Sequence, residues 1–309
     1  MNNKVIYITG ASGLVGRHII SELLSRTDYD IVAVSSVPDI VTSRYLECSR
    51  IYCMDYEGFL SLPPTETNEA DRFLIHCAFT RKNDPLEVKH SLDIAKSVLM
   101  KCACLGMTGV LNISSRSLYK EPEEGNLNTE DSELNLSSLI ALGKYAVELM
   151  TDAILSGANI AFSNLRLSSV NELKTDNNMI RPLNVFVENV IAGKPIRVIG
   201  GMQVMSFIDP RDVASAVRSL LNISPKQWKE KYNVGTGWMC TDTLLNMANL
   251  VVERAKVFGL EQVAIDVEKK EVNQRAGLDI NRITEDTGWK PQISLTEMID
   301  ALYRMKLQK

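Results

Sequence analysis

Three glycines near the start of the sequence have the residue type and the spacing to bind a phosphate group. Gly10, Gly13 and Gly16 follow an apolar run at 4–9 and precede a segment with helical periodicity. Glycine allows a tight turn and a close approach of the backbone to a pyrophosphate, and the free N–H groups at the start of a helix attract the anion. We therefore predict a strand, a phosphate-binding loop and a helix that together hold a dinucleotide. The alternative interpretation is an ordinary structural turn.

Ser35 bears on which dinucleotide is bound. It follows the apolar run 30–34, where a dinucleotide-binding fold normally has the acidic residue that holds the adenosine 2′-OH. A serine would not repel the 2′-phosphate of NADP. However, the next arginine along the chain is Arg44, so no arginine directly after Ser35 indicates NADP binding. The cofactor is therefore NAD or NADP, and this position does not choose between them.

A polar segment at 80–85 follows the apolar run 72–78. The carboxyl ends of parallel strands are where open α/β sheets bind their ligands. Arg81 and Lys82 could therefore contact a phosphate there, and a solvated loop is the alternative.

The elements that must position these residues alternate between strand and helix. Apolar runs predict strands at 4–9, 30–34, 50–55, 72–78, 109–115 and 159–167, and helical periodicity predicts helices at 14–26, 86–105 and 136–155. This alternation predicts an α/β fold with a Rossmann-like, doubly wound parallel sheet. Past residue 170 the rhythm changes, which indicates a smaller, mixed α/β C-terminal domain.

Composition excludes several classes of protein. The chain has 309 residues, 45% of them apolar, and a net charge of −4 without a long run of Lys or Arg, which argues against nucleic acid or an anionic membrane as the main partner. Its six cysteines and three histidines show no zinc-ligand spacing, so we expect no metal site. Without an apolar leader or a membrane-length apolar run, we expect a cytoplasmic protein.

Further motifs occur in an order that resembles the extended short-chain dehydrogenase/reductase family, which includes NAD-dependent nucleotide-sugar epimerases, dehydratases and ketoreductases. Besides the glycine loop, the motifs are Asp55-Tyr56, His76-Cys77-Ala78, Asn112-Ile113-Ser114-Ser115 with Tyr119, Lys144 with Glu148, and the segments 164–167, 212–214, 232–235 and 288–291. The resemblance covers nearly the whole chain. It implies an NAD(P)-binding Rossmann domain at 1–170, to which 204–237 returns, and a small substrate-binding domain at 171–203 and 238–309.

The resemblance also implies roles for individual residues. The cofactor pyrophosphate would lie on the loop formed by Gly10, Ser12, Gly13, Leu14, Val15 and Gly16, with Ser35 at the ribose position. Asp55 and Tyr56 would face the adenine, and Ala78 would form the wall of the cofactor cleft. Lys144 would bind the nicotinamide ribose, and Ser115 would donate a hydrogen bond to the reacting sugar oxygen.

The sequence departs from the family pattern at the acid/base position. The family has a Tyr four residues before its Lys, one helical turn away, where the ammonium can lower the phenol pKa. Here that position is Ile140, which cannot exchange a proton. Tyr119 is a substitute catalytic residue only if its loop folds into the cleft, and a packed tyrosine is the alternative.

A second departure concerns substrate binding. Met205 stands where the family usually has an Arg that holds the sugar-nucleotide diphosphate, and a thioether cannot replace a charged, planar guanidinium. Arg275 and Arg211 are, with Arg81, the remaining candidates for binding the substrate phosphates. A surface arginine is the alternative for each.

These features predict an NAD(P)-dependent epimerase or ketoreductase that acts on a nucleotide sugar or a related hydroxyl or keto substrate. Dehydration is disfavoured because Arg116-Ser117 replaces the Asp-Glu pair of the 4,6-dehydratases. The alternative is a catalytically degenerate NAD(P)-binding protein with a regulatory or scaffold role. We also expect a homodimer through the helices at 86–105 and 136–155, whose apolar residues exceed one core face. These residues are Leu92, Ala95, Val98, Leu99 and Cys102 in the first helix and Leu142, Ala146, Leu149 and Met150 in the second.

Overall fold

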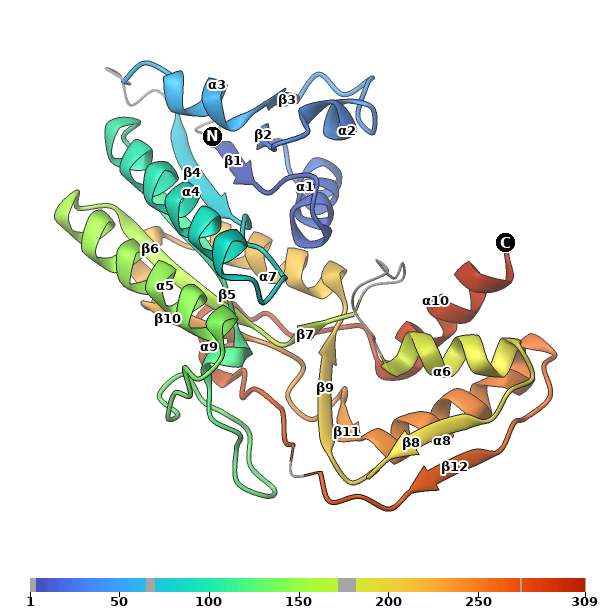
Figure 1. The fold of residues 1–309 in the computed structure, drawn as a ribbon. Coiled ribbons are helices and arrows are strands. Elements are labelled where there is room, and N and C mark those ends of the chain that lie inside the picture. Colours follow the sequence, from blue (N-terminus) through green and yellow to red (C-terminus); the bar gives the residue numbers. More distant parts are fainter. Residues whose placement is uncertain (1–3, 65–69, 172–181, 273, 309) are drawn as a thin grey trace.

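The computed structural model describes residues 4–64, 70–171, 182–272 and 274–308. A large sheet covered by helices occupies one part of the molecule, and a smaller group of helices and short strands lies beside it (Figure 1). Within the described residues, no helix combines the length and the apolar character needed to cross a membrane.

The large sheet has seven parallel strands in the order β10-β6-β5-β4-β1-β2-β3. Their bounds are β1 Lys4–Thr9, β2 Asp30–Val34, β3 Ile51–Met54, β4 Asp71–His76, β5 Gly109–Ser115, β6 Ala161–Leu167 and β10 Lys231–Val234. The strand order reverses between β1 and β4, and such a reversal opens a crevice at the carboxyl ends of the strands. The predicted Rossmann-like α/β fold is confirmed.

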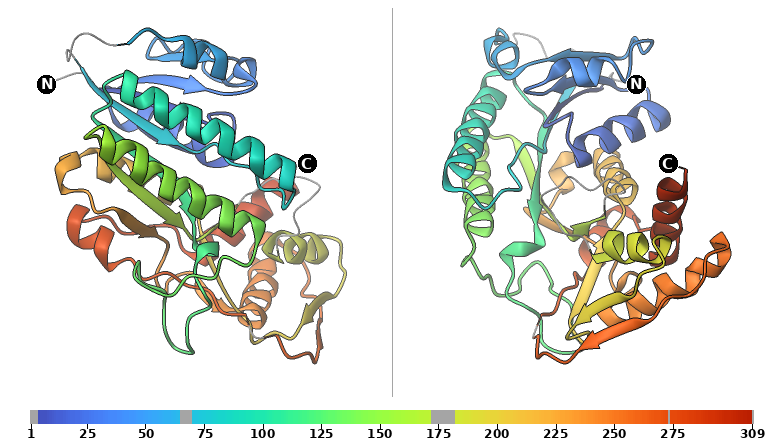
Figure 2. Two further views of the ribbon diagram at one scale, coloured as in Figure 1. Left: turned by 60° about the vertical axis from the view of Figure 1, so that its left-hand side comes forward. Right: turned by 45° about the vertical axis from the view of Figure 1, so that its right-hand side comes forward.

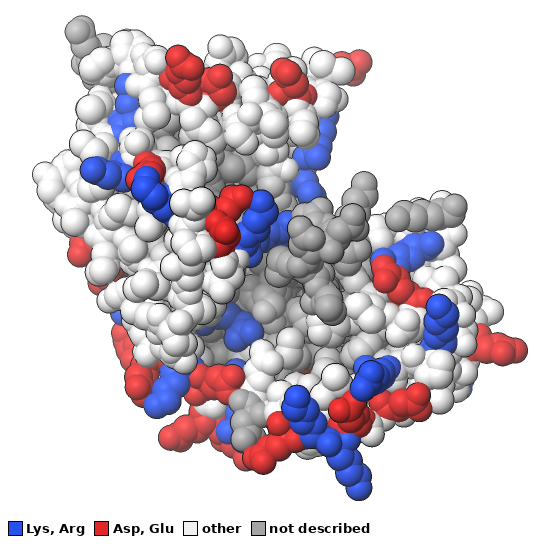
Figure 3. All heavy atoms as spheres, in the orientation of Figure 1, with Lys and Arg blue, Asp and Glu red and all other residues white. Residues whose placement is uncertain are grey.

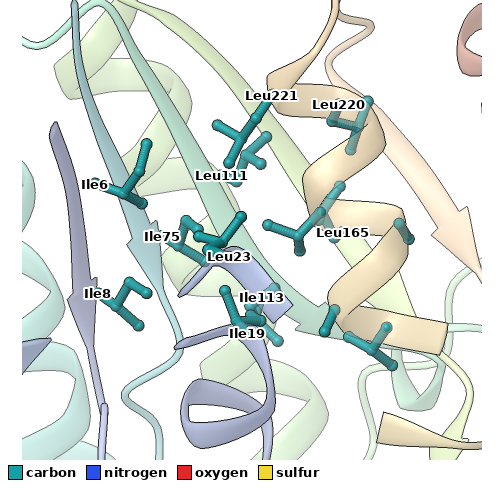
Figure 4. Packing of buried hydrophobic residues seen from close by; sticks show 14 of the residues in the cluster. Ile6, Ile8, Ile19, Leu23, Ile75, Leu111, Ile113, Leu165, Leu220 and Leu221 are labelled. Atoms are coloured by element: carbon teal, nitrogen blue, oxygen red, sulfur yellow. The ribbon is translucent and has the colours of Figure 1, made fainter. Parts of the chain in front are cut away.

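Helices cover both faces of this sheet (Figure 2). On one face α1 (Leu14–Arg26) and α7 (Pro210–Leu221) pack against alternate strand residues, among them Ile8, Ile75 and Leu165 (Figure 4). On the other face lie α4 (Pro85–Cys104) and α5 (Leu139–Gly157), with the short helix α3 (Tyr56–Ser61) beside α4. The alternation follows from the two-residue period of strand side chains. The short helices α2 (Pro38–Thr42) and α9 (Asn281–Thr287) add Val41 and Ile283 to the first core.

The smaller part has its own core and two small sheets. One sheet has the order β11-β9-β7, and the other pairs β12 with β8. The bounds are β7 Ser169–Val170, α6 Pro182–Ile191, β8 Ile196–Ile199, β9 Val204–Ile208, β11 Thr241–Thr243, α8 Leu244–Ala255, β12 Ile265–Glu268 and α10 Leu295–Leu307. Three single turns of 3₁₀ helix, η1 (Arg116–Leu118), η2 (Pro225–Gln227) and η3 (Lys256–Phe258), complete the described elements. The second core packs α6, α8 and α10 around residues such as Phe186, Met247 and Tyr303.

Only some elements of the segment 204–237 return to the large sheet. Helix α7 packs against α1, and β10 extends the large sheet, whereas β9 pairs with β7 and β11 outside that sheet. The domain boundaries at 170, 204 and 237 stay a prediction. Helix α5 begins at Leu139, later than the predicted 136, because the Ser138 side chain caps it by accepting a hydrogen bond from the Ala141 N–H.

Candidate functional site

The glycine loop lies between β1 and α1 at the carboxyl edge of the sheet. Gly10 has a φ of +69°, and a Cβ there would lie 2.9 Å from the Ala78 backbone nitrogen. A Cβ on Gly16 would lie 2.4 Å from the Gly10 carbonyl oxygen. Both contacts are closer than real Cβ atoms allow, so these two glycines permit backbone segments to pack together.

Gly13 has a different role, because it is exposed and has an ordinary φ of −72°. It is the N-cap residue of α1, and it provides no side-chain hydrogen bond to the first turn, which contains no acidic residue. The N–H groups of Leu14 and Val15 at this helix start therefore face no capping side chain, which suits an anion. A glycine-lined cradle at the positive end of a helix dipole fits a dinucleotide pyrophosphate.

Residues from β2 and α3 border this loop. The Ser35 side chain is buried, donates to Ser12 Oγ at 2.9 Å and accepts from the Val37 N–H at 3.1 Å. The Tyr56 hydroxyl accepts a hydrogen bond from the Gly10 N–H at 3.2 Å, and burial raises its pKa to about 12. Asp55 is exposed and caps α3 by accepting from the Gly58 N–H at 2.7 Å. The structure thus brings the predicted loop, ribose and adenine residues together at one edge.

Lys144 extends from α5 to the end of β5. Its Nζ donates to the Ile113 carbonyl oxygen at 2.6 Å and lies 4.6 Å from the centre of the Phe79 ring. Burial lowers the pKa of Lys144 to about 8, and the neighbouring Cys77 and Glu148 oppose this shift. The lysine therefore sits where its proton is released far more readily than in water. Ile140 lies one turn earlier, in the first turn of the same helix.

Ser115 ends β5 two residues beyond Ile113, the backbone partner of Lys144. Its Oγ accepts hydrogen bonds from the Ser117 N–H at 3.1 Å and from Ser117 Oγ at 2.9 Å. With both bonds received, the Ser115 hydroxyl proton remains available for a ligand oxygen. Sequence analysis did not assign this role to Ser117, although a serine two residues after another serine is a recognisable turn signal.

For Tyr119, the surroundings favour the alternative of a packed tyrosine over a catalytic role. Its side chain is 6% exposed, and its hydroxyl donates to Asn233 Oδ1 at 2.8 Å. The Arg166 guanidinium lies over its ring, 4.9 Å from the centre. The hydroxyl is thus engaged by a residue of β10, two strands away from Ser115, and Tyr119 is a packed tyrosine.

A buried ion pair holds α5 in register with the sheet. Glu148 accepts from Arg166 at 3.0 and 2.6 Å and from Ser114 Oγ at 2.5 Å, and both charged side chains are at most 6% exposed. Glu148 lies one helical turn after Lys144, so these bonds to β5 and β6 also fix the position of the lysine. The sequence analysis noted Glu148 without this structural role.

The strand order, the glycine loop and the bond from Lys144 to β5 near Ser115 agree with a match by sequence. Residues 6–235 match the model of the NAD dependent epimerase/dehydratase family. The chain belongs to this family.

Relatives of this epimerase/dehydratase span nearly all of the chain. A curated protein of Methanocaldococcus jannaschii, named a putative UDP-glucose 4-epimerase, is 24% identical over 316 residues, with 96% of each chain covered. Two solved structures have the same fold. The UDP-glucuronic acid 4-epimerase of Bacillus cereus has a TM-score of 0.77 at 19% identity, with 98% of this chain and 99% of the other covered. The UDP-glucose 4-epimerase of Thermotoga maritima has a TM-score of 0.78 at 18% identity, with 99% and 100% covered.

The three arginines predicted to bind substrate are dispersed in this member of the family. Arg81 is exposed in the segment after β4. Arg211 forms a two-pronged ion pair with Asp209, at 2.8 and 2.9 Å, and lines a cavity of about 430 Å³ beside α1. Arg275 pairs with Glu124 at 3.2 Å and lines a separate cavity of about 240 Å³ in the smaller part. Their roles toward substrate stay predictions, and Met205 packs against the second core.

The surface between the two parts of the molecule is hollowed, and basic atoms are visible in the hollow (Figure 3). Among the residues that the structure describes, no cluster of His, Cys, Asp and Glu has an arrangement that could hold a metal ion. His76, at the end of β4, is buried with Nδ1 2.7 Å from Thr9 Oγ1, and burial lowers its pKa to about 3, so it is neutral. Of His76 and Lys144, the lysine is therefore the one that can carry a charge near neutral pH.

Proposed function

We propose that this protein is an NAD(P)-dependent epimerase of a nucleotide sugar that works by hydride transfer. One observation carries the proposal: Lys144 binds the Ile113 carbonyl oxygen, two residues before Ser115 at the end of β5, and the glycine loop lies at the same carboxyl edge of the sheet. Family membership and relatives named as UDP-sugar 4-epimerases support the same activity. A ketoreductase would use the same residues and differ in releasing the reduced sugar.

In this proposal each residue has a defined task. The loop from Gly10 to Gly16 binds the pyrophosphate, and Lys144 binds the nicotinamide ribose hydroxyls. The bound nicotinamide supplies the acceptor and donor of the hydride. Ser115, whose oxygen already accepts two hydrogen bonds from Ser117, donates its proton in a hydrogen bond to the reacting sugar oxygen. No proton-transferring side chain stands at position 140, so we expect slow turnover.

We further propose a homodimer formed through α4 and α5, which lie side by side on one face of the sheet (Figure 2). The α4 residues first assigned to this interface are instead in or against the core, since Ala95, Val98, Leu99 and Cys102 are buried and Leu92 is half-buried. Exposed apolar side chains lie elsewhere on the pair, with Met100 on α4 and Leu142 and Leu149 on α5 each at least 50% exposed. Exposed apolar side chains on two neighbouring helices favour burial against a second copy.

The direct test is to incubate the protein with NAD or NADP and either UDP-glucose or UDP-glucuronic acid, and to identify products by NMR. We expect slow interconversion of the 4-epimers with one cofactor, and loss of it in Lys144→Met, which removes the ribose contact. The Lys89→Met variant is a matched control, because Lys89 is exposed on α4 and forms an exposed ion pair with Asp93. Absence of any product with every combination of sugar and cofactor would contradict the proposal.

A further inference from the structure

Arg116 follows Ser115 directly and is the first residue of η1. Its side chain is half-buried, and its Nε donates to Ser169 Oγ at 3.2 Å. Ser169 belongs to β7, the strand that pairs with β9 at the start of the smaller part. The guanidinium therefore reaches from the end of β5, beside the proposed reacting group, toward the strand that leads into the smaller part.

Arg116 lacks a countercharge in the described part of the chain, where no carboxylate lies within 4 Å of its guanidinium. Burial lowers its pKa below the ordinary value, and only the more distant Glu121 opposes this shift. Other buried or half-buried arginines of the same region do have carboxylate partners, as with Arg166 and Glu148 at 2.6 Å or Arg282 and Asp131 at 2.7 Å. Among the described residues, Arg116 thus differs from these two arginines in having no carboxylate partner.

A buried cation without a partner destabilises the folded protein, because its lost hydration is not replaced. A guanidinium has five N–H donors in a planar fork, and one of them has a protein acceptor here. Each side-chain nitrogen of Arg116 either has a hydrogen-bond partner or is exposed to solvent. The donors without a partner are therefore accessible to a ligand. A planar anion such as a carboxylate would use two of these donors at once.

We propose that Arg116 binds a carboxylate carried by the sugar ring that reacts at Ser115, so that this enzyme selects the nucleotide derivative of a uronic acid. This inference rests on the proposed function. Arg116 adjoins the reacting group in the chain, whereas Arg275 is paired with Glu124 and lines a separate cavity. The other source of an anion is the substrate diphosphate, and the test below separates the two.

The test measures binding of UDP-glucuronic acid and UDP-glucose, by calorimetry, to the cofactor-loaded parent protein and to Arg116→Gln. We expect the parent to bind the uronate more tightly. In the variant the uronate should lose roughly 10- to 100-fold in affinity, as expected for a charge-assisted, two-pronged bond, while UDP-glucose should stay within about threefold. Arg116→Lys keeps the charge without the fork and should recover only part of the loss.

Equal losses for both sugars would mean that Arg116 contacts the diphosphate, and would overturn the proposal. Unchanged affinity for both would also overturn it. A structural role is tested by the thermal midpoint without ligand: we expect Arg116→Gln to match or exceed the parent, because an uncompensated charge is removed, and a marked fall would contradict the proposal. Selective binding without turnover would count against the proposed function alone, turnover without selectivity against this inference alone, and no binding of either sugar against both.

Discussion

The charge of Lys144 depends strongly on its surroundings at this edge of the sheet. Its ammonium is enclosed by the Phe79 ring and a backbone carbonyl, and it has no ion pair in the part of the chain that the structure describes. Desolvation is the main cause of its lowered pKa of about 8. A cation of this kind attracts an anionic cofactor strongly only while it remains protonated.

We predict that cofactor affinity falls as the pH rises through about 8, because Lys144 then loses the proton that binds the ribose hydroxyls. Calorimetry across about two pH units on either side should show this decline. Lys144→Met should bind the cofactor more weakly and with little pH dependence, and a parallel decline in that variant would refute the assignment.

The same shift affects stability with a defined sign. The folded pKa of about 8 lies below the ordinary value of 10.5, so between these values the unfolded chain binds a proton that the folded chain does not. The contribution of Lys144 to the free energy of unfolding therefore rises with pH over that range, and is lost as the pH falls through 8.

At the scale of elements, the turn from β1 into α1 separates two kinds of glycine. Gly16 has no room for a Cβ, since the Gly10 carbonyl oxygen would lie 2.4 Å away, whereas Gly13 is exposed and has a φ that other residues adopt. One glycine is required by packing, and the other leaves space for the pyrophosphate.

We therefore predict opposite effects for two substitutions. Gly13→Val should abolish binding of NAD and NADP while lowering the thermal midpoint only slightly, because the added Cβ would lie 3.1 Å from the Gly10 carbonyl oxygen and the rest of the side chain would fill the ligand space. Gly16→Ala should lower the thermal midpoint, because two backbone segments must separate. Calorimetry and thermal unfolding of both variants provide the check, and unchanged cofactor affinity in Gly13→Val would show that the loop is misassigned.

The sequence sufficed for features that depend on local pattern. Glycine spacing identified the loop, and apolar periodicity placed the strands and α1, α4 and α5. Contacts across the sheet have no local sequence pattern that could predict them. For example, the Tyr119 hydroxyl donates to Asn233, which is 114 residues away in the sequence. The absence of a carboxylate partner for Arg116 could not be predicted either, because it depends on every described residue that packs around the guanidinium.

At the scale of the whole molecule, the proposed dimer depends on the exposed apolar side chains of Leu142 and Leu149 on α5 and Met100 on α4. We predict that the parent scatters light as a dimer and that Leu149→Glu is a monomer, because a charge would be buried at the centre of the interface. Leu46→Glu is the control, since Leu46 is 77% exposed between α2 and β3, away from both helices. A parent mass near 34.4 kDa at micromolar concentration would refute the dimer.

Ile140 bears on how fast the molecule as a whole transfers hydride. Its place one turn before Lys144 means that a phenol introduced there would lie beside the ammonium, which would lower the phenol pKa. The fold, the glycine loop, Ser115 and Lys144 are all present, although no phenol occupies position 140. We therefore expect the native protein to transfer hydride slowly and the Ile140→Tyr variant to transfer it faster.

The most direct measurement is single-turnover formation of reduced nicotinamide, followed by its absorbance after mixing excess protein and oxidised cofactor with a UDP-sugar. We predict that the absorbance rises in the parent and that Ile140→Tyr accelerates it by roughly 10²- to 10⁴-fold, the usual contribution of general acid–base catalysis. The account would be contradicted if both proteins bind cofactor and UDP-sugar and neither forms reduced nicotinamide.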